Sequence, residues 1–274
     1  MQLIDNPHRP GTAAPAIEAE NVRLVYGETG DARMVEAIQD VSFSVGQQQF
    51  VSIIGPSGCG KSTLLKLVAG LLQPTAGSLH VNGRTPDEAR RAHAVSFVFQ
   101  TPVLFPWRTV IENVALLLEV EGQSRQQRLA TAQEYLDLVG LRGFESHLPR
   151  QLSGGMQQRA SIARALSMDP LLLLMDEPFG ALDAITRDRM GLELVRIWER
   201  RQKTVLFVTH SISEAVLLSD AVIVMTARPG RILAHYTIDL PRPRSQEVRL
   251  TPEFVEYERH LLRDLEGDAA EVPA

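Results

Sequence analysis

The sequence predicts an α/β fold, in which a parallel-sheet core is joined to an antiparallel β subdomain and an α-helical subdomain. Three observations lead to this prediction. Short apolar runs typical of buried strands occur at residues 50–54, 95–99, 171–175 and 204–208. Residues 17–45 instead alternate apolar and polar side chains, which is typical of antiparallel strands. Between about residues 101 and 160, apolar side chains recur at helical spacing.

The domain boundaries follow from these changes of pattern. Residues 1–15 contain Pro, Gly and Ala without periodicity, so we expect a flexible N-terminal tail. Residues 16–245 are expected to form one folded domain, with the helical subdomain at about 101–160. Residues 246–274 are expected to hold a C-terminal helix, which begins near Thr251 and has an amphipathic face, followed by a tail.

A glycine-rich motif follows the first apolar run. Residues 55–63 read GPSGCGKST and satisfy the pattern G-x-x-x-x-G-K-[ST]. The strand before it and the predicted helix after it provide the context that a phosphate-binding loop requires. Backbone N–H groups and the helix N-terminus surround phosphates in such a loop, Lys61 is expected to reach the β- and γ-phosphates, and Ser62 to hold Mg²⁺. The residues expected to contact the nucleotide here are Gly55, Pro56, Ser57, Gly58, Cys59, Gly60, Lys61, Ser62 and Thr63.

Polar side chains stand where the other apolar runs end. Ligands of open α/β sheets bind at the carboxyl ends of the strands, so these side chains are candidates for catalysis. Asp176 fits the carboxylate on the Mg²⁺ side of the site, and Glu177 is placed to polarise a water molecule. His210 is expected to contact the γ-phosphate and to hold Glu177 in line. Gln100 is expected to reach the metal or the attacking water.

A second glycine motif, LSGGMQQR, occupies residues 152–159 at the predicted start of a helix. Ser153, Gly154 and Gly155 therefore offer a second anion-binding surface. One nucleotide has only one triphosphate, whereas each chain has two anion-binding surfaces. We expect two copies of the chain to close face to face, each supplying half of a site.

Composition excludes several function classes. Lys and Arg total 28 against 33 Asp and Glu, and the resulting formal charge of −5 argues against nucleic-acid binding. No apolar run approaches the roughly 18 residues of a membrane span, and no signal peptide is evident. We expect the chain to remain in the cytoplasm and to reach a membrane only through a partner.

The chain has one cysteine, Cys59, so it has no intrachain disulfide. Cys59 lies close to a predicted helix N-terminus and to Lys61, and both favour the thiolate. The sequence therefore predicts a sensitive thiol, which alkylation should modify and ATP should protect.

Taken in order, the motifs resemble those of ATP-binding cassette (ABC) ATPases. The resemblance covers about residues 16–245 and rests on GPSGCGKST, Gln100, LSGGMQQR, LLLLMDEP, Ala181-Leu182-Asp183 and His210. It implies a P-loop NTPase (RecA-like) core that hydrolyses ATP with Mg²⁺. It further implies a head-to-tail homodimer, in which two ATP molecules lie between P-loop and LSGG surfaces.

The family resemblance also assigns residues outside these motifs and exposes two departures. Tyr26 holds the place of an aromatic side chain that stacks on adenine, and Asp183 is placed among the nucleotide-binding residues. Met156 stands where the family usually has Gln. Gly180 stands where the family usually has Ser, which puts one contact across the dimer interface in question.

Finer features resemble the nitrate/sulfonate/taurine class of bacterial importer ATPases. They are Leu104 to Trp107, Asp176 to Arg187, Arg228 to Arg231 and Asp239 to Arg244. This likeness implies integral membrane permease subunits as partners, and indirectly a periplasmic or lipid-anchored solute-binding protein. It also implies a peripheral location at the cytoplasmic face of the inner membrane and a small anionic or nitrogen- or sulfur-containing solute.

Two other functions are compatible with a P-loop. A soluble ABC-type ATPase could remodel a non-membrane partner, whereas a small-molecule kinase would leave LSGGMQQR without a purpose. The segment Thr101 to Trp107 distinguishes the importer from the remodelling ATPase, because it is aromatic, stiffened by proline and suited to docking. The alternative is that this segment is a buried part of the core.

Overall fold

The computed structural model describes residues 14–27, 34–180, 182–201 and 203–270. Its centre is a six-stranded sheet in the order β5-β6-β7-β3-β8-β9. The first five strands in this order are parallel, and β9 pairs antiparallel with β8 at one edge. The strands are β3 (Phe50–Ile54), β5 (Val95–Val98), β6 (Leu172–Asp176), β7 (Thr204–Val208), β8 (Ala221–Met225) and β9 (Ile232–Thr237).

The central strands form a sheet because both of their faces are buried. Every residue of β3, β6, β7 and β8 is buried, as expected for parallel strands covered on both sides. Successive side chains point to opposite faces. Phe50 and Phe207 therefore pack in one hydrophobic core, whereas Val51 and Leu206 pack in the other. The predicted runs at 50–54 and 204–208 coincide with β3 and β7.

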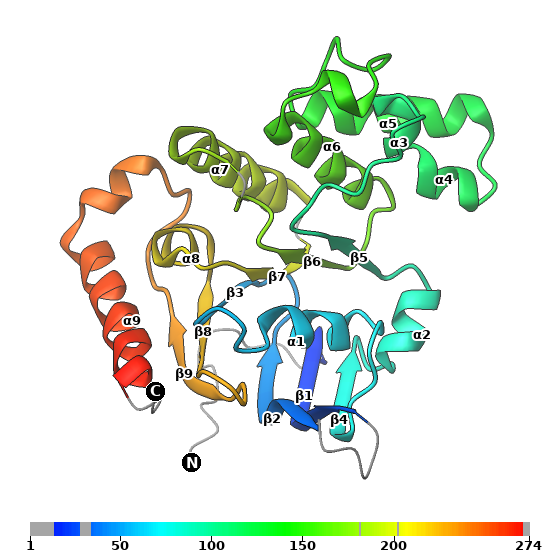
Figure 1. Cartoon of the computed structure of the whole chain (residues 1–274). Coiled ribbons are helices and arrows are strands. Elements are labelled where there is room, and N and C mark those ends of the chain that lie inside the picture. Colours follow the sequence, from blue (N-terminus) through cyan, green and yellow to red (C-terminus); the bar gives the residue numbers. More distant parts are fainter. Residues whose placement is uncertain (1–13, 28–33, 181, 202, 271–274) are drawn as a thin grey trace.

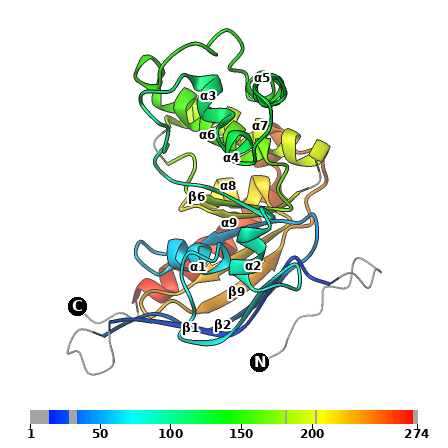
Figure 2. The same cartoon turned by 90° about the vertical axis from the view of Figure 1, so that its right-hand side faces the viewer.

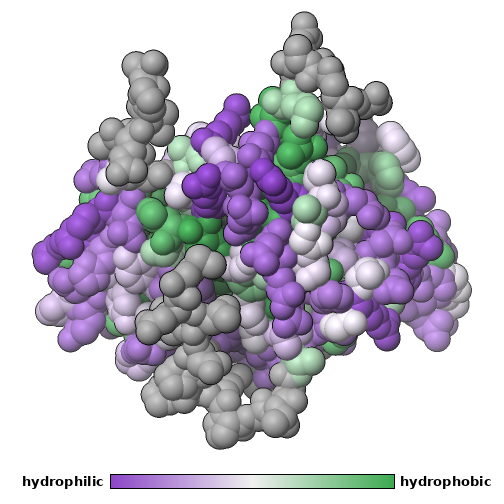
Figure 3. Space-filling model, turned by 90° about the horizontal axis from the view of Figure 1, so that it is seen from below, coloured by the Kyte–Doolittle hydropathy of each residue, from purple (hydrophilic) through white to green (hydrophobic). Residues whose placement is uncertain are grey.

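A second sheet lies beneath the central one and is antiparallel, in the order β2-β1-β4 (Figure 1). Its strands are β1 (Ile17–Tyr26), β2 (Val35–Val45) and β4 (Ala76–Val81). The alternating pattern predicted β1 and β2, whereas β4 was not predicted; it lies between the glycine-rich loop and β5 in the chain and pairs with β1. From below, this side of the molecule is largely hydrophilic, with hydrophobic side chains gathered in small areas (Figure 3).

Helices cover both faces of the central sheet. The helices of the core are α1 (Lys61–Val68), α2 (Pro86–Arg91), α7 (Ala184–Arg201), α8 (Ile212–Leu218) and α9 (Pro252–Ala270). One hydrophobic core joins residues of α1 and α2 to the antiparallel sheet, and the other contains residues of α7, α8 and α9. In Figure 2, α1 and α2 lie on the side of the central sheet that faces the antiparallel sheet. The last helix begins where predicted, since the Thr251 hydroxyl accepts a hydrogen bond from the Phe254 N–H at 3.3 Å.

A helical subdomain stands on the opposite side of the central sheet from the antiparallel sheet (Figure 2). Two of its helices begin with capping boxes, at Thr109 with Glu112 and at Ser124 with Gln127. Its elements are α3 (Val110–Val114), α4 (Leu116–Val120), α5 (Arg125–Leu138), a short 3₁₀ helix (Pro149–Gln151) and α6 (Gly154–Ser167). A second 3₁₀ helix, Gln246–Leu250, precedes α9.

The structure also bears on two expectations, the flexible N-terminal tail and the lack of a membrane span. The predicted N-terminal tail falls almost entirely on residues 1–13, which lie outside the described residues. Among the described helices, none combines the length and the apolar character needed to cross a membrane.

Candidate functional site

The glycine-rich loop connects the central strand β3 to α1, as predicted. Gly58 and Gly60 have φ values of 75° and 103°, which glycine adopts without the strain that other residues would suffer. Lys61 is only 6% exposed. Its Nζ donates to the backbone oxygens of Gly55 at 2.8 Å and Pro56 at 2.9 Å. The loop therefore places the Lys61 ammonium group at the N-terminus of α1, where the backbone N–H groups also favour binding of an anion.

The two residues predicted to hold the metal from the core meet directly. The Ser62 Oγ donates to the Asp176 Oδ1 at 2.8 Å, across 114 positions of sequence. Burial raises the pKa of Asp176, and the bond from Ser62 opposes this rise. A hydroxyl and a carboxylate with little access to solvent are the hard oxygen donors that Mg²⁺ prefers. The pair fits a magnesium ion that would neutralise charge on bound phosphates.

The three predicted catalytic side chains converge on one carboxylate. The Glu177 Oε2 lies 3.3 Å from Gln100 Nε2 and 3.2 Å from His210 Nδ1. Glu177 immediately follows β6 with φ of 42°, and its N–H donates to the Val208 oxygen at 2.9 Å. This left-handed turn directs the side chain away from the strand path. Among the described residues, Gln100 is hydrogen-bonded to Glu177 rather than to Ser62 or Asp176.

A further polar network supports the His210 loop, and the sequence analysis missed it. The Thr209 Oγ1 donates to the Glu214 Oε2 at 2.6 Å, and Arg187 Nε lies 3.5 Å from the other Glu214 oxygen. Glu214 is 7% exposed, and burial raises its pKa. Arg187 also donates to the Leu182 oxygen at 3.0 Å. The network thus links the start of α7 to the start of α8, and no local pattern in the sequence indicated it.

Ser153 is the N-cap residue of α6, which lies in the helical subdomain and not beside the P-loop (Figure 1). Its hydroxyl accepts from the Met156 N–H at 3.3 Å and caps the helix. The exposed Ser153 and Gly154 leave the helix start open to solvent. Met156, one of the departures from the family pattern, supplies only this backbone donor to the cap and is half-buried against the core.

The segment after Glu177 contains the second departure. A Cβ on Gly180 would lie 3.7 Å from the Glu177 Oε2 and 3.8 Å from Gln100 Nε2, which are ordinary contacts. The position usually held by serine therefore adjoins Glu177 and Gln100. Ala181 lies outside the described residues, and Asp183 caps α7 by accepting from the Thr186 N–H at 3.0 Å. This bond lowers the pKa of Asp183.

Tyr26 lies beside the glycine-rich loop, and its hydroxyl is 3.4 Å from Thr63 Oγ1. With 43% of its surface exposed, its ring is accessible for the predicted stacking. The prediction of a sensitive thiol at Cys59 is wrong. Cys59 is 1% exposed, and burial raises its pKa more than the nearby Lys61 ammonium, 3.8 Å from Sγ, lowers it. Sequence proximity to a cation did not reveal the burial.

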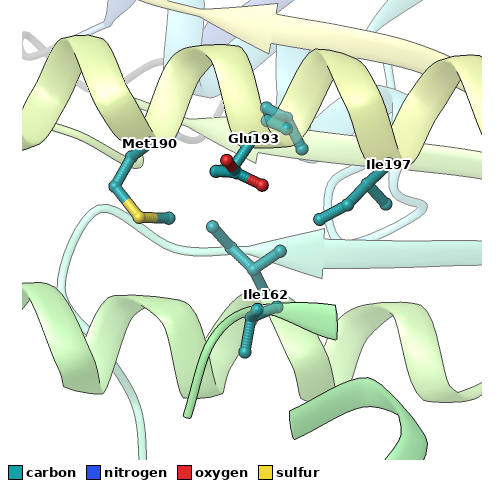
Figure 4. Close-up of a pocket in the computed structure, with 6 residues that line it drawn as sticks. Ile162, Met190, Glu193 and Ile197 are labelled. Carbon is teal, nitrogen blue, oxygen red and sulfur yellow. The ribbon is translucent and has the colours of Figure 1, made fainter. Parts of the chain in front are cut away.

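A small apolar gap lies between α6 of the helical subdomain and α7 of the core (Figure 4). Ile162 of α6 faces Met190, Glu193 and Ile197 of α7 across it. Its volume of about 10 Å³ holds roughly one water molecule and no nucleotide. The gap is a packing seam between two helices, separate from the phosphate-binding loop.

Together, the strand–loop–helix geometry, the Ser62–Asp176 pair and the Glu177 cluster define a P-loop nucleoside triphosphatase. The family model described as ABC transporter matches residues 38–180. The chain belongs to the ABC transporter family.

Similar proteins align with most of this chain. An uncharacterised ABC transporter ATP-binding protein of Methanocaldococcus jannaschii is 46% identical, with 92% of each chain covered. A taurine import ATP-binding protein of Rhizobium johnstonii is 45% identical, covering 84% of this chain and 88% of its own. A nitrate import ATP-binding protein of Synechocystis is 43% identical, covering 91% and 94%.

A solved structure of similar architecture is a dimeric ATP-binding cassette in a post-hydrolysis state with ADP and phosphate. It superposes with a TM-score of 0.73 at 33% identity, and covers 82% of this chain and all of the other. These findings confirm the predicted family, the P-loop fold class and the enzyme class, an ATPase of a transporter.

Proposed function

We propose that the chain is the ATP-hydrolysing subunit of a bacterial importer for a small anionic or nitrogen- or sulfur-containing solute, of the nitrate, sulfonate and taurine kind. The observation that carries the proposal is the hydrolytic cluster around Glu177, assembled in a chain whose LSGG surface lies on another subdomain. The names of its taurine- and nitrate-import relatives support the solute class.

Each side chain of the cluster has a distinct role in the proposed hydrolysis. Lys61 binds the β- and γ-phosphates, and Ser62 with Asp176 holds Mg²⁺. Glu177 orients the attacking water and accepts its proton at a carboxylate oxygen. His210 and Gln100 hold that carboxylate through the 3.2 and 3.3 Å contacts.

The proposal includes a head-to-tail homodimer. The helix start at Ser153 is exposed and offers N–H groups to an anion, yet it belongs to the helical subdomain. A second copy of the chain would bring this surface to the γ-phosphate bound by Lys61. Because the phosphate then bridges two chains, ATP binds the closed dimer more tightly than the open one. ATP shifts the population toward closure for that reason, and hydrolysis reverses the shift.

A surface suited to a membrane subunit follows Gln100, and we call Thr101–Trp107 the docking segment. Trp107 is 72% exposed and stacks on Phe105, with ring centroids 5.0 Å apart. The backbone of this segment is anchored, since Asn113 bonds both the N–H and the oxygen of Phe105, at 2.7 and 3.1 Å. Anchored backbone and outward aromatic rings fit an interface rather than a core.

A groove of about 280 Å³ runs between the edge strand β5 and the helical subdomain. Phe97 and Val120 supply apolar walls, and Arg90, Arg164 and Glu121 supply charge of both signs. Arg164 also donates to the Val103 oxygen at 2.6 Å, which ties the groove to the docking segment. We propose that permease subunits dock here, placing the chain peripherally at the cytoplasmic face of the membrane, and that any solute-binding protein acts only through them.

The test is co-purification with the membrane subunit, using a chain that carries both Phe105→Ala and Trp107→Ala. We expect association to fall at least tenfold, since truncating an aromatic anchor often costs about 2 kcal/mol or more. ATP binding and the melting temperature should be preserved because Trp107 is exposed. Phe144→Ala is the matched control, because this partly exposed ring lies in the same subdomain, outside the docking segment, and contacts His147.

A large drop in melting temperature of the double variant would show that the docking segment is core, and the assignment would be withdrawn. The alternative, an ATPase that remodels a non-membrane partner, predicts that the chain co-purifies with a partner that is not integral to a membrane. Permease subunits in the purified complex would exclude that alternative.

A further inference from the structure

The turn Arg228–Arg231 connects β8 to β9, and hydrolysis as described above gives it no role. It is fastened to strand β2. The Gly230 N–H donates to the Ala37 oxygen at 3.0 Å, and the Gly230 oxygen accepts from the Gln39 N–H at 3.0 Å. Arg231 Nε donates to the Gln39 Oε1 at 2.8 Å. The turn therefore has a fixed position that does not depend on the nucleotide-binding loop.

In this position the turn contacts the P-loop directly. Arg228 Nε donates to the Gly58 oxygen at 2.9 Å, across 170 positions of sequence. A Cβ on Gly230 would lie 2.1 Å from the Cys59 oxygen, so only glycine permits this approach. Two consecutive peptides of the phosphate-binding loop thus rest against one turn.

The bond from Arg228 also fixes which way a P-loop N–H points. The carbonyl and the N–H of a trans peptide point in opposite directions. With the Gly58 oxygen held by Arg228, the Cys59 N–H points the opposite way and donates to the Pro56 oxygen at 3.3 Å, which closes a turn within the P-loop. Gly58 has a φ of 75°. Because glycine has no side chain to restrict its backbone, the Gly58–Cys59 peptide could rotate easily without the bond from Arg228. Arg228 therefore opposes rotation of the Gly58–Cys59 peptide and helps to hold this turn of the P-loop.

We propose that Arg228 is a positioning residue for ATP: by holding the Gly58–Cys59 peptide, it keeps the P-loop in the conformation that receives the phosphates. The proposal rests on the assignment of Gly55–Thr63 as the ATP site. Arg228 acts from behind the loop and touches none of the cluster around Glu177. Its loss should therefore weaken nucleotide binding and leave the hydrolytic step intact.

The experiment compares the steady-state ATPase of the full chain with that of Arg228→Ala, Arg228→Lys and Arg231→Ala. Arg231 is the matched control, since it carries the same charge in the same turn but bonds Gln39. Loss of one charge-assisted hydrogen bond predicts a rise in the KM for ATP of roughly three- to tenfold in Arg228→Ala. We expect kcat to stay within about twofold. Lysine, which keeps one cationic donor, should recover part of the loss, and Arg231→Ala should leave KM within about twofold of the native value.

A second readout is the rise in melting temperature when ATP is added, which should be smaller for Arg228→Ala than for the native chain. An unchanged KM in Arg228→Ala, or an equal rise in Arg231→Ala, would overturn the proposal. Lys61→Ala separates this failure from failure of the ATP site. If Lys61→Ala binds ATP as the native chain does, the site itself is wrong. If only Lys61→Ala is defective, the role of Arg228 alone is overturned.

Discussion

Replacing Glu177 by glutamine tests the chemistry at the centre of the site. The carboxylate receives two contacts, from Gln100 at 3.3 Å and from His210 at 3.2 Å. Glutamine keeps the size and one acceptor oxygen but removes the charge and the ability to accept a proton. Losing a general base costs roughly 10²–10⁴ in rate, which corresponds to about 2.7–5.4 kcal/mol in the activation free energy.

The effect on folding should be much smaller than the effect on rate. The Glu177 side chain is 22% exposed, and its two contacts are longer than a usual charge-assisted hydrogen bond. We therefore expect the free energy of unfolding to change by less than about 1 kcal/mol. ATP binding should persist, because Lys61 and Ser62 are untouched. With turnover blocked, ATP should accumulate on the protein and stabilise the dimer.

The assay is phosphate release, accompanied by nucleotide binding and size-exclusion chromatography with Mg²⁺ and ATP. Glu193→Gln is the control, because this partly exposed carboxylate on α7 pairs with its helix neighbour Arg196, at 2.6 Å. Residual turnover of Glu177→Gln within about tenfold of the native rate would remove Glu177 from the role of base.

Three further predictions follow from buried groups. Alkylation of Cys59 in the folded chain should be at least tenfold slower than in urea, because the thiol is buried and its pKa raised; equal rates would contradict the burial. As pH rises above about 4.5, Glu214→Gln should become more stable relative to the native protein, because burial raises the pKa of Glu214 and the native protein loses stability as this carboxyl group ionises. The charged groups near Glu214 are Arg187, His210 and Asp188. A difference in melting temperature that shrinks as pH rises would refute this prediction. Arg244→Ala should lower the free energy of unfolding by about 3 kcal/mol, because this buried guanidinium bonds backbone oxygens at the end of α8, including Val216 at 2.9 Å and Ser219 at 2.7 Å; a loss under 1 kcal/mol in chemical denaturation would show that those oxygens find other partners.

The parts of the fold that the sequence predicted are those where local pattern and tertiary environment agree. The strands at 50–54 and 204–208 are apolar because both faces of the central sheet are covered, so composition alone located them. Strand β4 was missed for the opposite reason. Only Leu79 and Val81 of Ala76–Val81 are buried, and its pairing with β1 is a long-range contact without a local signal.

The candidate site shows the same division. Strand-end position was enough to group Asp176, Glu177 and His210, since the carboxyl ends of parallel strands meet at one edge. The left-handed backbone at Glu177 and the Thr209–Glu214–Arg187 network depend on tertiary packing, which no spacing rule encodes. Cys59 was misjudged because neighbouring charge is visible in a sequence, whereas burial of the side chain in a hydrophobic core is not.

The central claim is that one ATP lies between the P-loop of one chain and the LSGG surface of another. It is tested most directly by mixing two single-cysteine chains in a Cys59→Ser, Glu177→Gln background, one with Ser57→Cys and the other with Ser153→Cys. We predict a disulfide-linked dimer on mild oxidation with ATP and Mg²⁺, and little without nucleotide, because only ATP binding brings the two surfaces together. A mixture that forms no crosslink although both chains bind ATP, or that crosslinks equally without nucleotide, would contradict the account.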